Sequence, residues 1–132
     1  FNEIKVSKLD LSYNQIFYME RKALYGIIGL EELILESNNL KSVFLNDLIS
    51  LIHLNLVKNE LASIKNETLA NLINLERLDL RGNKISEIES GSFQNLFKLK
   101  NLHLEYNKLR FFEKNLFISL KNLEFMNLMN NE

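Results

Sequence analysis

Few side chains in this sequence have the chemistry for catalysis or metal binding. The 132 residues include two histidines, His53 and His103, and no cysteine. Two histidines can share a metal ion only when both reach it. A pair of carboxylates such as Asp10 and Asp79 can hydrolyse a glycoside only when the two flank the scissile bond. A serine nucleophile such as Ser12 needs an adjacent base. Whether any of these residues meet depends on the elements that carry them.

The elements follow from an asparagine that recurs at a nearly constant interval. It stands at Asn14, Asn38, Asn59, Asn83, Asn107 and Asn131, at intervals of 24, 21, 24, 24 and 24 residues. Around Asn83 the frame reads Leu75, Leu78, Leu80, Asn83 and Ile85, which are numbered steps 1, 4, 6, 9 and 11. Apolar residues occupy steps 1, 4, 6 and 11 around the other asparagines too, except that the sequence ends before step 11 of the last copy. The sequence therefore consists of six repeats.

Each repeat has the spacing of one short strand followed by a turn. The leucines at steps 4 and 6 share one face of a strand, because successive side chains alternate across it. One such strand cannot bury its apolar face alone, so we expect the six strands to stack into a parallel sheet. We expect the step-9 asparagines to stack as a ladder that satisfies the backbone of the turns. A helical solenoid is the alternative, but step 6 after step 4 breaks the helical spacing.

The frame resembles the leucine-rich repeat, in the 24-residue class of extracellular proteins such as Toll-like receptors, small leucine-rich proteoglycans and insect immune repeat proteins. The resemblance implies an α/β fold, a right-handed solenoid with about six short parallel strands on a concave face and mostly irregular convex arcs. Residues 1–132 are predicted to form a single domain. The cysteine-bearing caps of extracellular relatives are missing, and Phe1 and Ile4 look like the tail of an earlier repeat. We therefore expect a fragment without its N- and C-terminal caps.

The repeats separate the residues with catalytic potential. His53 and His103 fall two strands apart, at least about 10 Å, which is too far for a shared metal. Asp10 and Asp79 fall three strands apart, and Ser12 has no histidine on its own strand or the next. Gly82 stands alone, so no glycine loop for phosphate is present. We expect no enzyme activity, no metal site and no cofactor.

Function is then expected on the concave face, where the residues at steps 3, 5, 7 and 8 project and vary while the frame does not. Aromatic, aliphatic and charged residues at these steps are the candidates for partner binding, and the resemblance points to the same face. They are Tyr13, Ile34, Glu36, Val57, Lys58, Arg77, Arg81, His103, Tyr106, Phe125 and Met129. The alternative is ordinary surface, since isolated exposed apolar residues are common and Arg81 has Glu105 beside it for a cross-strand ion pair.

Composition narrows the class of partner. The net charge is −1, from 16 basic and 17 acidic residues, which gives no bulk attraction to nucleic acid or an anionic membrane. No apolar run approaches the roughly 18 residues that a membrane span needs. Asn66, Glu67 and Thr68 form one glycosylation sequon, and Asn66 is expected to be exposed on the arc.

Two functions remain open. The first is a protein-recognition module of a secreted or cell-surface receptor, immune or adhesion protein, binding a protein ligand or another leucine-rich repeat chain through the concave sheet. The second is a structural spacer or dimerisation segment of a larger protein, which would include an intracellular protein with an enzyme domain. The extracellular or cell-surface location is implied by the resemblance to the 24-residue class.

Overall fold

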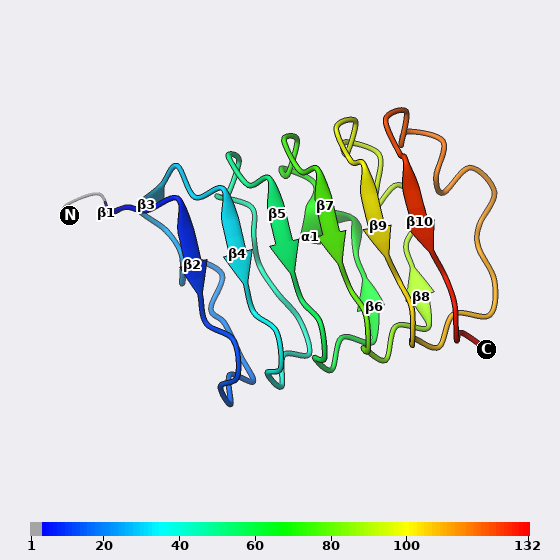
Figure 1. Cartoon of the computed structure of the whole chain (residues 1–132), viewed down its shortest axis with the longest axis horizontal. Coiled ribbons are helices and arrows are strands. Elements are labelled where there is room, and N and C mark those ends of the chain that lie inside the picture. Colours follow the sequence, from blue (N-terminus) through cyan, green and yellow to red (C-terminus); the bar gives the residue numbers. More distant parts are fainter. Residues whose placement is uncertain (1–3) are drawn as a thin grey trace.

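The computed structural model describes residues 4–132 and forms a solenoid around a parallel sheet (Figure 1). Phe1 lies outside the described residues. Six three-residue strands follow one another across the sheet in chain order: β2 (Lys8–Asp10), β4 (Glu32–Ile34), β5 (His53–Asn55), β7 (Arg77–Asp79), β9 (Asn101–His103) and β10 (Phe125–Asn127). Every neighbouring pair is parallel and keeps the repeat register, so Leu54 stands opposite Leu33 on one side and Leu78 on the other. The predicted six-stranded solenoid is confirmed.

The core is the stack of repeated apolar steps. Leu33, Leu54, Leu78 and Leu102, the step-4 leucines of four consecutive strands, are 0–1% exposed. The arcs contribute the remaining apolar side chains, such as Phe93, which is fully buried and stacks on Phe117 with ring centroids 5.9 Å apart. Burial of apolar surface is the main source of stability in such a stack.

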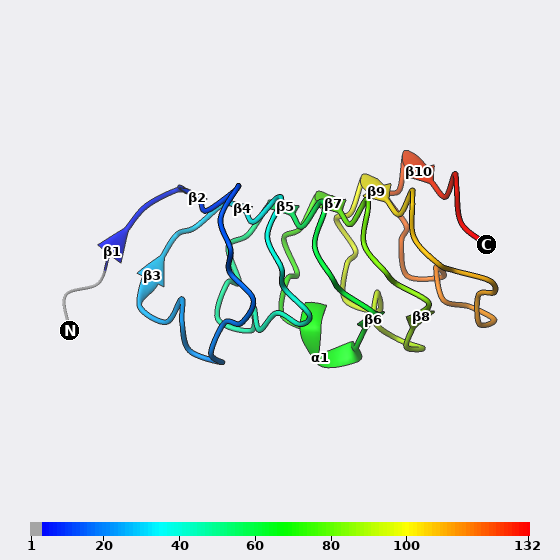
Figure 2. The ribbon, with the colours of Figure 1, turned by 90° about the horizontal axis from the view of Figure 1, so that it is seen from below.

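The sheet and the arcs lie on opposite sides of the solenoid (Figure 2). The arcs hold one short helix, α1 (Asn66–Leu69), and a two-stranded pairing of β6 (Ser63–Ile64) with β8 (Glu87–Ile88). Near the N-terminus, β1 (Ile4–Lys5) pairs with β3 (Ile27–Ile28), which places Ile4 opposite Ile27. Within residues 4–132, none of the helices has the length and hydropathy of a membrane span.

The 21-residue repeat keeps its core although it is three residues shorter. Its arc contributes Val43, Leu45 and Leu48, and all three side chains are buried. The shorter arc therefore leaves the apolar interior uninterrupted.

The asparagine ladder is present, and Asn83 shows its pattern. The Nδ2 group donates to the carbonyl of Leu80 in its own turn (3.0 Å) and of Leu56 in the preceding repeat (2.9 Å). The Oδ1 atom accepts from the backbone N–H of Leu61 (3.1 Å). The same three bonds recur at the other buried asparagines, Asn38, Asn59 and Asn107. These side chains satisfy the turn backbone and join adjacent repeats.

The two outer asparagines differ from the inner four. Asn131 is half-buried and still makes the three bonds, to Leu104, Leu128 and Leu109. Asn14 is exposed, and its Nδ2 group donates only within its own turn, to the carbonyls of Leu11 and Ser12. Asn14 therefore closes a turn without joining two repeats, contrary to the uniform ladder that the spacing predicts.

A second set of asparagines, which the sequence reasoning missed, links the loops that precede the strands. The Nδ2 groups of Asn71, Asn74, Asn95 and Asn122 each donate to a backbone carbonyl 25 residues earlier. Asn71 and Asn95 are 24 residues apart, which is the length of one repeat. This spacing could have indicated the second set of asparagines from the sequence. From β5 to β10, adjacent repeats are therefore joined by side-chain amides on both sides of the strands.

Candidate protein-binding surface

The outer side of the six strands presents the variable steps of each repeat and is called the sheet face. Side chains at steps 3, 5 and 7 alternate with the buried leucines, and they form three columns that cross the strands. A groove of about 420 Å³ lies over β4, β5 and β7 on this face. Its lining includes Glu32, His53, Arg77, Asp79 and Arg81, so it is predominantly polar and carries both signs of charge.

Asp79, at the end of β7, is a buried carboxylate that is fully paired. Arg81 donates to it through Nε (2.8 Å) and Nη2 (2.7 Å), and Arg77 places Nη2 3.6 Å from its Oδ2 atom. The hydrogen bond to Asp79 raises the pKa of Arg81, and the charges of Glu105 and Glu36 add to the shift. The two nitrogens of the guanidinium match the two carboxylate oxygens in this bidentate geometry. Arg81 is therefore paired with Asp79 of its own repeat and not with a residue of a neighbouring strand.

Glu105, two residues after β9, is the second buried carboxylate on the sheet face, and it is only half satisfied. Its Oε1 atom lies 3.2 Å from Nδ1 of His103. The Oε2 atom is buried and has no hydrogen-bond partner among the described residues. The predicted cross-strand pair of Arg81 with Glu105 is therefore wrong, because Asp79 has the guanidinium.

Exposed apolar side chains stand on the same face. Tyr13, Tyr106, Phe125 and Met129 are between 45% and 75% exposed, and the Phe125 ring lies 5.1 Å from the His103 ring. Val57 is different: it is only 7% exposed, so the prediction that it offers an anchor to a partner is wrong. Its step-7 neighbours Glu36 and Arg81 have longer side chains.

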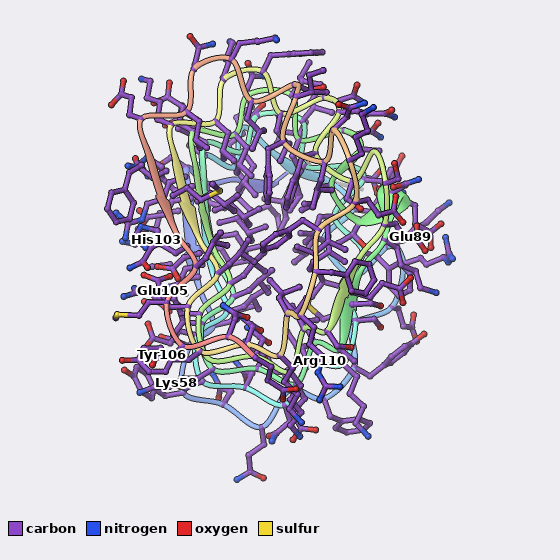
Figure 3. All side chains as sticks on the ribbon, turned by 90° about the vertical axis from the view of Figure 1, so that its right-hand side faces the viewer. Lys58, Glu89, His103, Glu105, Tyr106 and Arg110 are labelled. Atoms are coloured by element: carbon purple, nitrogen blue, oxygen red, sulfur yellow. The ribbon has the colours of Figure 1, made fainter. Side chains whose placement is uncertain are left out.

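The remaining candidates are polar or half-buried. Glu36 accepts from Asn55 Nδ2 (3.2 Å) and from the hydroxyl of Tyr13 (3.4 Å). Ile34 is half-buried at the end of β4, and Lys58 is exposed. Figure 3 shows Lys58, His103, Glu105 and Tyr106 together on the sheet side, with Glu89 on the opposite side. The candidates therefore share one face, with Val57 covered.

The step-8 residues adopt the left-handed backbone conformation in every repeat, a feature that the sequence reasoning missed. Their φ angles are 55° at Tyr13, 55° at Ser37, 53° at Lys58, 65° at Gly82, 58° at Tyr106 and 57° at Asn130. Glycine and asparagine adopt this conformation readily, whereas a bulky tyrosine rarely does. Gly82 and Asn130 both stand at step 8, and their residue types could have indicated this conformation from the sequence. Tyr13 and Tyr106 are thus exposed aromatic residues on a strained but rigid turn.

The residues with catalytic potential stay apart. His53 on β5 and His103 on β9 are separated by β7, and Asp10 on β2 is separated from Asp79 by β4 and β5. Asp10 instead accepts from Ser12, through the hydroxyl (2.6 Å) and the backbone N–H (2.9 Å), and these bonds lower the pKa of Asp10. In the part of the chain that the structure describes, no three His, Cys, Asp or Glu residues form a group that would hold a metal ion.

Known proteins share both the repeat and its geometry. Residues 73–132 match the leucine rich repeat family. TLR13, whose crystal structure is a complex with ssRNA13, is similar to 92% of this chain with a TM-score of 0.89 and 30% identity. The chain is a leucine-rich repeat protein.

A second leucine-rich repeat structure, a protein of Leptospira interrogans, is similar to 94% of the chain with a TM-score of 0.84 and 33% identity. The chain spans 18% of the TLR13 chain and 31% of the Leptospira chain. No curated protein sequence matches it. The repeat spacing of this leucine-rich repeat protein is consistent with the 24-residue class.

The sequon of the leucine-rich repeat chain lies on the arc side. Asn66 is exposed at the first residue of α1. Its Oδ1 atom accepts from Ser92 Oγ (3.2 Å), and its backbone N–H donates to Glu89 (3.0 Å). A glycan on Asn66 would therefore leave the sheet face open.

Proposed function

We propose that this leucine-rich repeat chain is a non-enzymatic protein-recognition module that binds its partner through the sheet face. The observation that carries the proposal is the placement of exposed aromatic and apolar side chains, Tyr13, Tyr106, Phe125 and Met129, on a mainly polar sheet. Aromatic anchors within polar surroundings are typical of the centres of protein interfaces. The solenoid holds them on strands and turns that hydrogen bonds fix, so little entropy is lost when a partner binds.

We further propose that the module belongs to a secreted or cell-surface receptor, immune or adhesion protein. The likeness to TLR13 and the repeat spacing support this location and role. The exposed sequon at Asn66 is compatible with a secreted protein. A structural spacer would not need exposed aromatic residues on the sheet face.

A nucleic-acid ligand has one argument in its favour, because the TLR13 structure is a complex with ssRNA13. The sheet face argues for a protein instead. Binding along a phosphate backbone requires a basic groove, whereas this groove contains Glu32, Glu76 and Asp79 beside its arginines. The proposed ligand is therefore a protein, and RNA binding is an outcome that the experiment below detects.

The test compares sheet-face and arc variants in binding. The partner is first captured from a secreted and surface-protein fraction, identified and purified, and its dissociation constant is then measured. Tyr106→Ala combined with Phe125→Ala should weaken binding about 100-fold, because two interface anchors are removed. The control, Phe111→Ala with Ile118→Ala, removes exposed apolar residues outside the sheet face and should change affinity less than about two-fold. Equal effects of the two pairs, or binding of a single-stranded RNA in place of any protein, would overturn the proposal.

A further inference from the structure

One buried atom on the sheet face has no internal explanation. Glu105 is 5% exposed, and its Oε2 atom is the one buried side-chain nitrogen or oxygen of residues 4–132 without a hydrogen-bond partner. Buried polar atoms are nearly always paired in folded proteins, and a buried charge without a full set of partners is the costlier case. The frame of this protein pairs its buried asparagines completely, so the exception at Glu105 points to a partner outside the chain.

Neither the column neighbours of Glu105 nor His103 donates a hydrogen bond to its Oε2 atom. In the step-7 column Arg81 lies on one side and Met129 on the other, because Gly82 and Tyr106 donate to the carbonyls of Glu105 and Met129. Arg81 is bonded to Asp79 through two nitrogens, and a methionine side chain has no donor. The Nδ1 atom of His103 lies against the other carboxylate oxygen, Oε1, at 3.2 Å. Oε2 is therefore left for a donor from another molecule.

The surroundings of Glu105 define the chemistry of that donor. Tyr106 follows Glu105 in the chain and Met129 is its column neighbour, and both side chains are more than half exposed. Phe125 is 45% exposed and lies against His103, which itself contacts Glu105. A carboxylate beside aromatic faces suits a cation that also stacks. Guanidinium meets both requirements, because it is planar, carries several donors and packs on aromatic rings.

We propose that Glu105 is the acceptor for an arginine side chain of the protein partner, with Phe125 and Tyr106 stacking against the guanidinium. Met129 and Tyr106 flank Glu105 and are more than half exposed, so rotation of their side chains opens the path to Oε2. This inference rests on the proposed function, since it assigns the chemistry of one contact within the same sheet face. It also gives the half-paired carboxylate a role, because the arginine would complete its hydrogen bonds on binding.

The test uses two peptides that differ at one side chain. Acetyl-Gly-Arg-Gly-amide and the same peptide with citrulline in place of arginine are titrated into the ¹⁵N-labelled protein. The amides of residues 101–107 and 125–130 should shift saturably with the arginine peptide. The citrulline peptide should bind about ten-fold more weakly, since it lacks a charge-assisted hydrogen bond.

Variants of the protein locate the contact. Glu105→Gln and Glu105→Met should each reduce the affinity for the arginine peptide about ten-fold, while Phe125→Ala should reduce it less, because stacking is the smaller contribution. The amide spectrum of each variant shows whether it is folded. A matched control is Glu89→Gln, which lies on the arc side and should leave the titration unchanged.

The failures of the two proposals are distinguishable. Equal binding of the arginine and citrulline peptides, no shift at β9 and β10, or full affinity in folded Glu105→Gln would overturn the arginine contact. The proposed function would still stand after any of these results if the Tyr106 and Phe125 double variant lost partner binding. A uridine oligonucleotide that shifts the same amides more strongly than the arginine peptide would also overturn the inference.

Discussion

The turn ladder and the sheet face both cross the repeats, and they treat buried polar groups differently. Asn107 in the ladder and Glu105 on the sheet face are two residues apart and almost equally buried. Asn107 donates to two carbonyls and accepts from Ile85, each within 3.1 Å, whereas Glu105 has one oxygen without a partner. Among residues 4–132, the buried side-chain atom without a hydrogen-bond partner therefore lies on the variable face and not in the repeated frame.

The two buried carboxylates of the sheet face make the contrast sharper. Asp79 has both oxygens bonded by Arg81, with Arg77 close by. Glu105, in the next repeat, has one histidine contact. Neighbouring strands can thus carry one carboxylate as part of the fold and another that is available for binding, because the frame does not prescribe what stands at steps 5 and 7.

The largest effect should come from the ladder. Asn83→Ala leaves the carbonyls of Leu56 and Leu80 and the N–H of Leu61 without partners, so it should lower the free energy of unfolding by about 3 kcal/mol. Urea denaturation measures the change. Asn14→Ala is the matched control at the exposed end of the ladder, where a loss below about 0.5 kcal/mol is expected. A loss at Asn83 as small as that at Asn14 would remove the ladder from the explanation of stability.

The next effect should come from the paired carboxylate. Asp79→Asn removes the bidentate acceptor and leaves the two arginines facing a neutral amide, which should cost about 2 kcal/mol in urea denaturation. The arginines are nearly half exposed, which keeps the cost below that of a fully buried ion pair. Asp10→Asn changes the same step on β2 and serves as the control, where a smaller loss is expected because Asp10 is exposed. No change in Asp79→Asn would mean that this ion pair contributes nothing to the fold.

A smaller effect should separate backbone from side chain at step 8. Gly82→Ala should cost about 1 kcal/mol because the φ of 65° disfavours a side chain. The added Cβ itself meets Lys58 Cγ at 3.4 Å, an ordinary contact. Tyr106→Gly should cost nothing or stabilise the protein slightly, since it removes the same strain. If thermal denaturation shows that Tyr106→Gly is the more damaging change, the tyrosine has a packing role and the strain is minor.

The smallest effect concerns an exposed ion pair between repeats. Lys100 donates to Glu76 (2.9 Å) and lowers the pKa of that carboxyl below its ordinary value of 4.5. A lowered pKa in the folded state adds stability above the ordinary pKa, and this contribution is lost as the pH falls through the folded value. Lys100→Gln should therefore flatten the fall in melting temperature at acidic pH slightly. An unchanged pH profile would show that solvent screens the pair.

Much of the frame could be predicted from residue types alone. The leucines at steps 4 and 6 and the inner asparagines occupy the predicted core and turns, because a periodic pattern has one way to bury all of its copies together. The end of the ladder could not be predicted from Asn14 itself. An asparagine becomes buried only when another repeat covers it, and that is a property of the stack.

The sheet face was less predictable. Alternation assigned Val57 and Glu105 to this face correctly, but it gave no measure of how far neighbouring side chains cover them. The guanidinium of Arg81 had two carboxylates in reach, and only its geometry selects Asp79 over Glu105. The location of the chain outside or at the surface of the cell, and its binding of a protein, stay predictions.

The central claim is that the buried asparagines of the frame have their hydrogen-bond partners within the chain, whereas Glu105 on the sheet face lacks one. One pair of variants tests this claim directly. The free energies of unfolding of Asn107→Ala and Glu105→Met are measured in urea beside the unmodified protein. Asn107→Ala should lose about 3 kcal/mol, whereas Glu105→Met should lose none and gain up to about 2 kcal/mol, because an apolar side chain of similar size replaces a half-paired buried charge. A loss in Glu105→Met as large as that in Asn107→Ala would contradict the account.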